Sequence, residues 1–388
     1  MLNVILIANY ENDRQESMLR FAGLLEAELG KAGISVEVIR PQAFFGRLKR
    51  GATGIGKWLG YIDKFLIFPL ALINKLRRLR GEDCVVHICD HSNAIYTRWL
   101  QKIPHLVTCN DLLAVRSARD EFPTHHTGFT GKFLQHWICR GLVRAVRITC
   151  ISEATMCDLL RLPGIAPAKV DVTYMGLNHP YTPMPKAQAL LQIEKLAVGA
   201  VPYLLHVGGN QWYKNRLGVL QIYAALDESI RSFKLVMVGP AFDRAMIEFI
   251  DSHPEIAANV VSLTDVDNET LSALYSAAEL LLFPSLEEGF GWPIVEAQAC
   301  GCRVVTTRKA PMTEAGGDAA FYLPACESNG EIHGWVEKAA QVVKRALAQD
   351  DVARAEMVAR GLQNAERFSA TAMAQRYVAI YRELLYKP

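Results

Sequence analysis

Two glutamates, Glu288 and Glu296, are separated by seven residues, and glycines stand between them at Gly289 and Gly291. The glycines let a ligand approach the main chain, because no Cβ is in the way. If a helix follows, its first N–H groups and its positive dipole end suit an anion such as phosphate. Two carboxylates beside that anion are able to hold the hydroxyl pairs of a sugar. The pattern favours a site for phosphate and sugar hydroxyls.

The residues around the two glutamates predict the elements that position them. Leu280–Phe283 is a short apolar run that favours a buried strand, and Pro293 suits the first residue of a helix. We expect Glu288 on the loop between them and Glu296 in the first helical turn. The spacing alone leaves a second interpretation open, in which this is an ordinary strand, turn and helix with two solvated glutamates.

This region resembles a known family. Glu288 and Glu296 are similar to the E-x7-E motif of the retaining GT-B glycosyltransferases of family 4. Three neighbouring segments resemble that family in the same order along the chain: 265–275 is similar to D-x-x-L-x-x-L-Y, 297–305 to the stretch that follows the motif, with Arg303 where proline is usual, and 314–320 to E-x-x-G-x-A-A. The resemblance is strong over about residues 200–325 and weaker elsewhere.

A second glycine turn follows another predicted strand. Gly208, Gly209 and Asn210 form the turn, and Lys214 and Arg216 stand where a helix opens. Cations there oppose the helix dipole, so we expect an anion such as a diphosphate to neutralise them, with solvated surface cations as the alternative. The stretch resembles the family's G-x-x-x-x-K-N element, with Lys214 at the lysine. Gly209 stands where the family frequently has a pyrophosphate arginine, and Arg216 is the candidate substitute.

The resemblance implies a role for each of these residues. Glu296 would hold the ribose of the donor, Glu288 would contact the transferred sugar, and Lys214 would neutralise the leaving diphosphate. Backbone groups of Phe290 and Gly291 would contact sugar and phosphate. Fixed cations and N–H dipoles stabilise charge that develops on a leaving group. We therefore expect a UDP or GDP sugar as donor, with no metal and no cofactor. The remaining residues of the predicted donor site are Gly208, Gly209, Asn210, Arg216 and Gly289.

Polar residues also follow two strands predicted in the first half of the chain. Asp90 and His91 follow one strand, and Asn110 and Asp111 follow the next. Parallel sheets bind ligands at the carboxyl ends of their strands, so we expect these residues on the acceptor side of the site. Asn110 stands where many relatives have histidine, and Asp111 matches their aspartate. His91 is the candidate replacement, with a structural hydrogen-bonding role as the alternative. His91 and Asp111 are thus candidate catalytic residues.

The elements that position these residues are those of an α/β protein. The chain has 388 residues, 21% charged and 51% hydrophobic, which fits two globular α/β domains. Short apolar strands alternate with segments of helical period, which predicts parallel strands with crossover helices. Together with the resemblance, this predicts a GT-B fold, in which two Rossmann-like domains face each other across a cleft.

We expect an acceptor-binding domain at 1–185, a nucleotide-sugar-binding domain at 200–368, and a helix at 369–388 that, by analogy with the family, returns to the first domain. Residues 181–185 are the predicted linker. No apolar run is long enough for a transmembrane helix, and the first residues indicate a buried strand rather than a signal peptide. The nine cysteines show no paired or zinc-binding spacing, which favours reduced thiols in a cytosolic protein.

The net charge of +2 hides an uneven distribution. Residues 1–185 carry 23 Lys and Arg against 16 Asp and Glu, a balance of +7, whereas the rest carries 19 against 24, a balance of −5. Residues 44–80 hold nine basic residues, one acidic residue (Asp63), and interleaved aromatic and aliphatic side chains. This composition suits shallow burial in an anionic leaflet, where each cation contributes about 1 kcal/mol.

We therefore expect residues 44–80 to contact an anionic membrane surface, and the acceptor to be a lipid-linked or membrane-associated glycan. An amphipathic helix packed on the first domain is the main alternative. Nucleic acid is less favoured, because the segment is too apolar for a phosphate groove. The expected location is cytoplasmic and peripheral, on the inner face of the membrane.

The leading functional hypothesis is a retaining glycosyltransferase of the hexosyltransferase type, acting in cell-surface polysaccharide or glycolipid assembly. A nucleotide-sugar epimerase or hydrolase on the same scaffold, which would need no acceptor, is one alternative. A nucleotide-sugar-binding protein without catalysis is another; Asn110 favours it, and the intact Glu288 and Lys214 argue against it. An oxidoreductase is least favoured, because no G-x-G-x-x-G fingerprint follows a predicted first strand.

Overall fold

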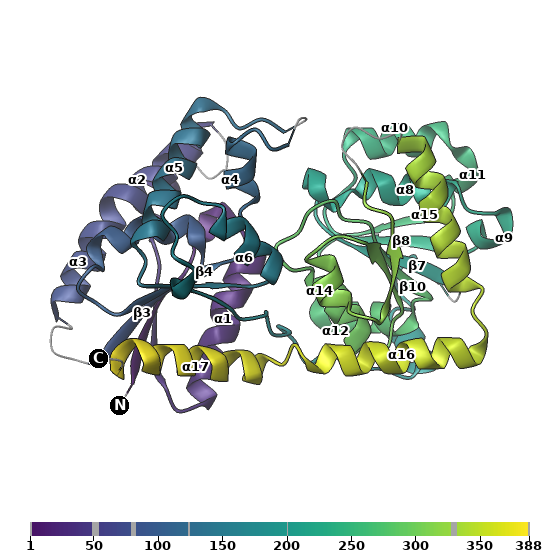
Figure 1. Ribbon diagram of the computed structural model, residues 1–388. Helices are drawn as coiled ribbons and strands as arrows, with labels where there is room; N and C mark the ends of the chain where they lie inside the picture. The colour runs from purple at the N-terminus through teal and green to yellow at the C-terminus, as the bar shows by residue number, and fades with distance from the viewer. Residues whose placement is uncertain are drawn as a thin grey trace. The chain divides into compact units, whose positions relative to one another are not determined.

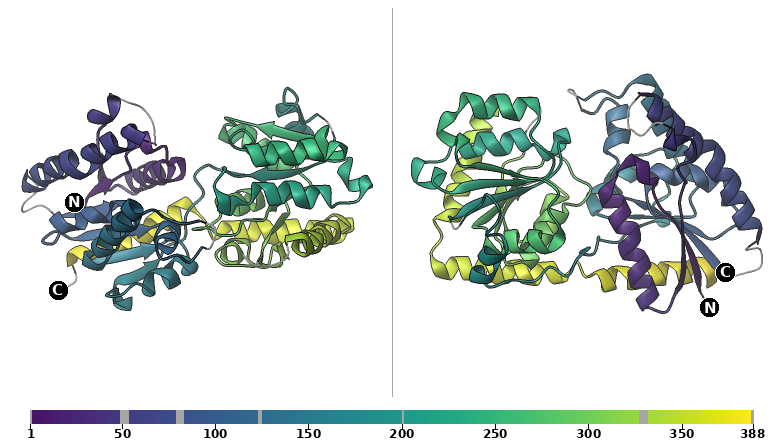
Figure 2. Two further views of the ribbon diagram at one scale, coloured as in Figure 1. Left: turned by 90° about the horizontal axis from the view of Figure 1, so that it is seen from above. Right: turned by 180° about the vertical axis from the view of Figure 1, so that it is seen from behind.

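The computed structural model describes residues 2–48, 54–78, 83–122, 125–199, 201–326 and 332–386. The chain divides into two compact units, shown in Figure 1. The first unit comprises Met1–Asn178 and Ala370–Pro388, and the second comprises His179–Ser369. Each unit contains a six-stranded sheet in which all paired strands run parallel, with helices on both faces (Figures 1 and 2). The predicted fold class, two Rossmann-like α/β units, is confirmed.

The sheet of the first unit has the order β2-β1-β3-β4-β5-β6. Its inner strands are buried on both faces, as is usual when helices cover a parallel sheet. The strands are β1 (Asn3–Ile7), β2 (Ser35–Ile39), β3 (Cys84–Ile88), β4 (His105–Cys109), β5 (Arg147–Cys150) and β6 (Val170–Val172). The α-helices are α1 (Glu16–Lys31), α2 (Gly54–Ile62), α3 (Phe68–Arg78), α4 (Leu113–Ala118), α5 (Phe129–Arg144), α6 (Glu153–Leu160) and α17 (Ala370–Tyr386). Shorter helical segments are η1 (Glu11–Asp13), η2 (Phe45–Arg47), η3 (Asp63–Ile67), η4 (His91–Trp99) and η5 (Pro167–Lys169).

Helix α17 comes from the end of the chain and packs in the first unit, beside α1 in Figure 1. A buried polar network joins it to the sheet. Nδ1 of His87 lies 2.6 Å from the Tyr381 hydroxyl, and Nε2 lies 2.7 Å from Oγ1 of Thr108, which is 3.0 Å from the Tyr377 hydroxyl. Burial lowers the pKa of His87 to about 3, so its ring is neutral and bridges the two hydroxyl groups.

The sheet of the second unit has the order β12-β11-β10-β7-β8-β9. The strands are β7 (Tyr203–Val207), β8 (Lys234–Val238), β9 (Val260–Leu263), β10 (Leu280–Phe283), β11 (Val304–Thr307) and β12 (Ala320–Leu323). The helices are α7 (Lys186–Gln192), α8 (Arg216–Ala224), α9 (Glu228–Arg231), α10 (Arg244–Ser252), α11 (Pro254–Ala257), α12 (Asn268–Ala277), α13 (Trp292–Ala299), α14 (Met312–Gly316), α15 (Ile332–Leu347), α16 (Asp351–Glu366) and the 3-10 segment η6 (Trp212–Lys214).

Two local expectations need correction. Helix α13 begins at Trp292, so Pro293 is its second residue, and Glu296 lies in its second turn rather than its first. The first unit ends at Asn178, before the predicted linker at 181–185, and Tyr181 is buried within the second unit. Both differences are small shifts along the chain, because the apolar pattern fixes an element more firmly than its ends.

The basic and aromatic segment at 44–80 lies partly outside the described residues, which lack 49–53 and 79–80. Its described part forms η2, α2, η3 and α3. Phe68, Leu72 and Leu76 of α3 are buried in the core of the first unit. An amphipathic helix packed on this domain, the alternative to membrane contact, is therefore present, and membrane contact itself stays a prediction. Other apolar side chains of the segment are exposed over more than half of their surface: Phe44, Leu48, Trp58, Leu66 and Leu70.

Candidate active site

The two predicted donor motifs follow neighbouring strands. Strand β10 pairs with β7, so the loops at their carboxyl ends lie side by side. The backbone N–H of Leu286 donates to the carbonyl of Tyr213 at 2.7 Å. The Asn215 side chain donates to the carbonyl of Pro284 at 3.1 Å. The sheet thus brings together two stretches that are about 70 residues apart in sequence.

Lys214 and Glu288 meet where these loops touch. Nζ of Lys214 lies 2.7 Å and 2.8 Å from the two carboxylate oxygens of Glu288. The Glu288 side chain is 6% exposed and that of Lys214 18%, so the pair is largely shielded from water. In this structure Glu288 is the anion that pairs with Lys214, and the predicted role of Lys214 toward a diphosphate stays a prediction. The two predicted catalytic groups of this unit form one bidentate pair.

Arg216 is the first residue of α8, and its guanidinium is buried against two loops. Nη1 donates to the Asn210 side chain and, at 2.8 Å, to the carbonyl of Pro240. Nε and Nη2 are buried and have no hydrogen-bond partner among the described residues. Burial lowers the pKa of Arg216, and the charge of Asp243 opposes that shift. Two unpartnered donors on a buried cation suit an anionic ligand.

Glycines let the loops approach each other closely. Gly239 has φ +147°, and a Cβ there would lie 2.1 Å from the carbonyl oxygen of Gly208. Gly291 has φ +104° and precedes α13, so its left-handed conformation turns the chain into that helix. Gly289 lies between Glu288 and the buried Phe290. At Gly209, by contrast, a Cβ would meet only the flexible side chain of Gln211.

The Phe290 side chain anchors the loop that leads from Glu288 into α13. Its ring packs on that of Phe368, with 5.3 Å between ring centroids, and its side chain is buried. The backbone of Phe290 and Gly291 is therefore held in place at the N-terminus of α13. Fixed backbone N–H groups at a helix N-terminus are suited to stabilise negative charge.

Glu296 is buried and accepts a hydrogen bond of 2.9 Å from the hydroxyl of Tyr275. Burial and the nearby Glu296 charge raise the pKa of Tyr275 well above its usual value, so the phenol stays protonated and donates. Sequence analysis missed this role, although Tyr275 ends one of the segments that carried the family resemblance. It also missed Lys309, whose ammonium pairs with Glu287, the residue before Glu288.

The first unit gathers a second polar cluster at the carboxyl ends of β1, β3 and β4. The buried carboxylate of Asp90 accepts hydrogen bonds from Asn9 at 2.7 Å and from Asn110 at 3.2 Å, and another from Ser92. Nδ1 of His91 lies 3.0 Å from an Asp90 oxygen, close enough for an ion pair but not aligned for a hydrogen bond. The predicted acceptor residues thus meet around Asp90.

Electrostatics in this cluster favour a charged histidine. Burial alone would lower the pKa of His91, but the carboxylates of Asp90 and Asp111 raise it above its usual value. Burial alone would raise the pKa of Asp90, but His91 and the hydrogen bonds from Ser92 and Asn9 lower it. Asn110 donates to Asp90 rather than acting as a base. Asp111 accepts from the backbone N–H of Leu113, the first residue of helix α4, at 3.0 Å.

The described residues contain no group of three His, Cys, Asp or Glu side chains placed to bind a metal ion. None of their helices is both long and apolar enough to cross a bilayer.

Comparisons with known proteins place this geometry in a family. The profile of the Glycosyl transferases group 1 matches residues 191–351, and that of Glycosyltransferase Family 4 matches residues 20–179. O-antigen chain mannosyltransferase B of Escherichia coli is 26% identical over 249 residues, which are 64% of this chain and 63% of that enzyme. The chain thus spans less than two thirds of that relative's length.

Solved structures share the fold over the full chain. Sucrose-phosphate synthase of Thermosynechococcus elongatus has a TM-score of 0.74 at 20% identity, with 100% of both chains covered. Anabaena HepE, solved in complex with UDP and glucose, has a TM-score of 0.67 at 15% identity, covering 97% of this chain and 98% of that one. The two family profiles, the parallel sheets and these neighbours agree: the chain belongs to the group 1 glycosyltransferases and has the GT-B fold.

Proposed function

We propose that this glycosyltransferase moves a sugar from a UDP or GDP sugar to a lipid-linked or membrane-associated glycan, with retention of the anomeric configuration and without a metal ion. The observation that supports this most directly is the Lys214–Glu288 pair, which lies beside the Gly291 turn into α13. The pair places a cation and a carboxylate at the loop that leads into α13. These are the groups that a diphosphate and a sugar need.

Donor binding is proposed to split this pair. The diphosphate would take over Lys214 and the unpartnered donors of Arg216. Glu288, released from the lysine, would accept hydrogen bonds from the sugar. Glu296, held by Tyr275, would bind the ribose hydroxyls. A UDP complex of a structural neighbour and a mannosyltransferase relative support a nucleotide-sugar donor and a glycan acceptor.

The proposed sugar transfer needs no protein nucleophile. A bond forms between an acceptor hydroxyl oxygen and the anomeric carbon, and the bond from that carbon to the phosphate oxygen breaks. Its electron pair goes to the leaving diphosphate, which also takes the proton of the acceptor hydroxyl. Lys214 and the N–H groups at α13 stabilise the charge that develops on the diphosphate. The Asp90–His91–Asp111 cluster is proposed to hold the acceptor.

The first test is donor binding and product analysis. We expect calorimetry to detect UDP or GDP binding, and incubation with the matching nucleotide sugar plus an acceptor to yield a product with the donor's anomeric configuration. Turnover of the donor alone, at the rate seen with acceptor, would instead identify a hydrolase or epimerase. Absence of binding by every nucleoside diphosphate and nucleotide sugar tested would remove the proposal.

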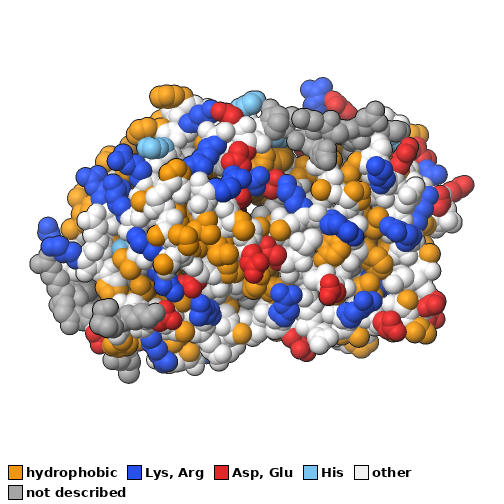
Figure 3. All heavy atoms as spheres, viewed as in Figure 1, with side chains coloured by type: hydrophobic (Ala, Val, Ile, Leu, Met, Phe, Trp, Pro, Cys, Tyr) orange, Lys and Arg blue, Asp and Glu red, His pale blue; other side chains and the backbone are white. Residues whose placement is uncertain are grey.

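Membrane contact is proposed from the exposed side chains of the first unit. Arg47, Arg77 and Arg78 are exposed and form no ion pair with a described residue. Lys64 and Lys75, in contrast, pair with Asp13 at 2.7 Å and Glu37 at 2.6 Å. Figure 3 shows hydrophobic and basic side chains alternating along the edge that α2, α3 and α5 form in Figure 1. Interleaved groups of these two kinds suit an anionic lipid surface.

Helix α5 extends this surface beyond the segment that the sequence indicated. Phe129 and Phe133 are exposed and stand four residues apart on α5, and Trp137 continues the row. The Trp137 ring packs on Phe65, with 5.4 Å between centroids. Phe65 in turn contacts Tyr61 of α2 at 5.2 Å. The aromatic row of α5 and the described part of the 44–80 segment are therefore in contact.

A vesicle assay tests this surface. We expect vesicles of phosphatidylcholine with phosphatidylglycerol to retain the protein at low salt, and retention to fall about tenfold or more when Trp58, Leu66 and Leu70 are all changed to Ser, because less apolar surface is buried. The control is Val352→Ser, which removes an equally exposed apolar side chain of the second unit. Equal retention of the triple variant and the control would contradict membrane contact.

A further inference from the structure

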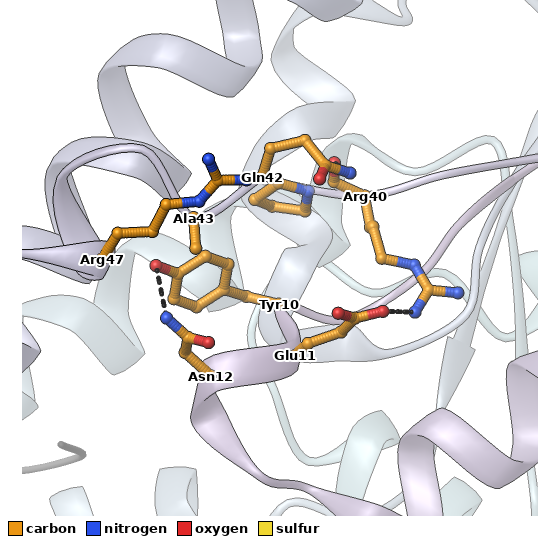
Figure 4. A pocket seen from close by; sticks show the side chains of 8 residues that line it. Tyr10, Glu11, Asn12, Arg40, Gln42, Ala43 and Arg47 are labelled. Atoms are coloured by element: carbon orange, nitrogen blue, oxygen red, sulfur yellow. Dashed lines mark hydrogen bonds and ion pairs between the residues drawn. The ribbon is translucent and has the colours of Figure 1, made fainter. Parts of the chain in front are cut away.

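A pocket of about 210 Å³ lies within the first unit, at the carboxyl ends of β1 and β2. Its lining comes from three short stretches: Tyr10, Glu11, Asn12, Arg40, Pro41, Gln42, Ala43 and Arg47. Figure 4 shows the Tyr10 ring near the centre, with Asn12 on one side and the Arg47 and Arg40 side chains at opposite ends. This pocket is separate from the Asp90 cluster, which it does not include.

The lining is suited to an anion. Two arginines and the side-chain amides of Asn12 and Gln42 supply hydrogen-bond donors. Arg47 is exposed and forms no ion pair with a described residue. Glu11 pairs with Arg40 at 2.5 Å. It therefore neutralises the charge of Arg40 but not that of Arg47. A guanidinium presents paired N–H groups that match the oxygens of a phosphate.

The pocket is firmly built, because Tyr10 is locked by its surroundings. Its hydroxyl donates to the fully buried carboxylate of Asp63 at 2.8 Å. A Cβ at Gly46 would lie 2.0 Å from this hydroxyl, and one at Gly60 would lie 3.2 Å from the ring. Burial, and then Asp63, raises the pKa of Tyr10 to about 12, so the phenol remains a donor at neutral pH. A side chain at Gly46 would therefore displace the tyrosine hydroxyl, whereas one at Gly60 would only tighten the contact with the ring.

The Asp63 carboxylate also fixes segment η2, which carries Arg47. Asp63 accepts backbone hydrogen bonds from Phe44 at 3.1 Å, Phe45 at 2.9 Å and Gly46 at 2.9 Å. Segment η2 is therefore fixed between the pocket and the apolar surface. Phe44 and Leu48, on either side of η2, are both exposed. A phosphate bound in this pocket would lie next to side chains suited to lipid.

We propose that this pocket binds a phosphate group that is attached to the glycan acceptor or belongs to a lipid beside it, an inference that rests on the proposed function. Arg47 and Arg40 are the binding residues, and Asn12 and Gln42 supply further donors. Glu11 limits the affinity, because it competes with the phosphate for Arg40. The pocket thus selects acceptors that carry phosphate next to an apolar chain.

Titration of the full chain with sn-glycerol 3-phosphate, followed by NMR, tests the pocket, with glycerol as the uncharged comparison. We expect binding of the phosphate compound only. Arg47→Gln and Arg40→Gln should each weaken it about tenfold, because a charge-assisted hydrogen bond is lost. Glu11→Gln should tighten it, because the competing carboxylate is removed. If Glu11 had only a structural role, its substitution would weaken phosphate binding rather than tighten it.

The matched control is Arg77→Gln, which removes an exposed arginine of α3 outside the pocket. Vesicles containing phosphatidylglycerol distinguish the two sources of phosphate. If these vesicles bind and the soluble compound does not, and Arg47→Gln weakens retention far more than Arg77→Gln, the ligand is a lipid headgroup. Two results would overturn the pocket. In the first, sn-glycerol 3-phosphate does not bind, and Arg47→Gln and Arg77→Gln reduce vesicle retention equally. In the second, sn-glycerol 3-phosphate binds the wild type and Arg47→Gln with the same affinity.

The test of the pocket and the test of the proposed function can be told apart, because the nucleotide is proposed to bind in the second unit and the phosphate in the first. Thermal stabilisation by UDP or GDP should be the same in the wild type and in Arg47→Gln. If the wild-type protein binds nucleotide but shows no Arg47-dependent binding of sn-glycerol 3-phosphate or of the vesicles, only the pocket proposal is overturned. Phosphate binding without any nucleotide binding would leave the pocket and remove the glycosyl-transfer proposal.

Discussion

Single side chains determine what the donor site is able to do. Lys214 and Glu288 lie on loops after neighbouring strands and neutralise each other in a shielded place. A neutral pair of this kind keeps a cation and an anion ready without leaving either charge uncompensated. Its chemistry depends on both partners, because removal of one leaves a poorly solvated charge.

Lys214→Met and Glu288→Gln should each lower the transfer rate by about 100- to 1000-fold, the usual loss when one group that stabilises a developing charge is removed. Initial rates with a fixed nucleotide sugar would measure this. The control is Lys344→Met, which removes a half-buried ammonium that pairs with Asp227 at 2.7 Å in the same unit. Wild-type rates in either site variant would refute the assigned roles.

His91 should make the stability of the first unit depend on pH. Its pKa is raised in the folded state, so its charge stabilises the fold fully below the unfolded value of about 6.5, and this contribution is lost as pH rises through the folded pKa. Asp90 and Asp111 are the charges that face it. The lowered pKa of Asp90 acts only in acid, outside this window.

His91 alone should therefore lower the unfolding free energy as pH rises above about 6, by at most about 1.4 kcal/mol per pH unit, the limit for one proton. Burial lowers the pKa values of His87, His105 and His206, which act in the opposite direction, so the effect of His91 is measured as the difference between the wild type and His91→Gln. Urea unfolding at several pH values should show that this difference in unfolding free energy shrinks as pH rises through the folded pKa of His91. A difference that does not change with pH would contradict the role of His91.

Close packing between elements positions these side chains. Helix α5 lies against η4, which begins at His91, and the contact is made through Gly141. A Cβ at Gly141 would lie 2.3 Å from the carbonyl oxygen of Ala94 and 2.4 Å from its carbon. The backbone cannot move away cheaply, because η4 also carries the buried Asn93 and Thr97.

Gly141→Ala should lower the unfolding free energy by about 1–3 kcal/mol, the usual cost of overpacking, and should disturb the His91 cluster. Gly23→Ala is the matched control on α1, where nothing lies within 4 Å of the added Cβ. There the better helix propensity of alanine should raise stability by roughly 1 kcal/mol. Urea unfolding curves that shift in the same direction for both variants would contradict this packing argument.

The two ends of the chain build one unit together. Helix α17 supplies Tyr377 and Tyr381 to the buried network around His87, and Thr371 bonds to Glu28 of α1 at 2.9 Å. The first unit is thus completed only when the last residues of the chain are present. The second unit is continuous in sequence, from His179 to Ser369.

A chain that ends at Ser369 lacks α17, and this exposes the apolar surface and the buried His87 that α17 covers. It should therefore lose the thermal transition of the first unit but keep the nucleotide-induced stabilisation of the second unit. Differential scanning calorimetry with and without UDP or GDP would measure both transitions. Tyr386→Ser, at the exposed end of α17, should leave them unchanged. An unaltered first transition in the shortened chain would contradict the role of α17.

Local patterns in the sequence predicted much of this fold. The strand at Leu280–Phe283 has the predicted bounds, because a buried parallel strand is a short apolar run between turn residues. The short strand β6 was not predicted, since its three residues include Asp171 and give no such run. Strand β12 was not predicted either, although its four residues are apolar. The family resemblance named the candidate donor residues from their order along the chain.

Contacts between distant residues were decided by the tertiary structure alone. The Lys214–Glu288 pair, the support of Glu296 by Tyr275, and the pocket at Arg40 and Arg47 all depend on which strands and helices become neighbours. A sequence pattern carries the burial of each residue but not the order of strands in a sheet. That order is set by how apolar faces pack together over the entire unit, so the partner of a buried charge appears only once the sheet has formed.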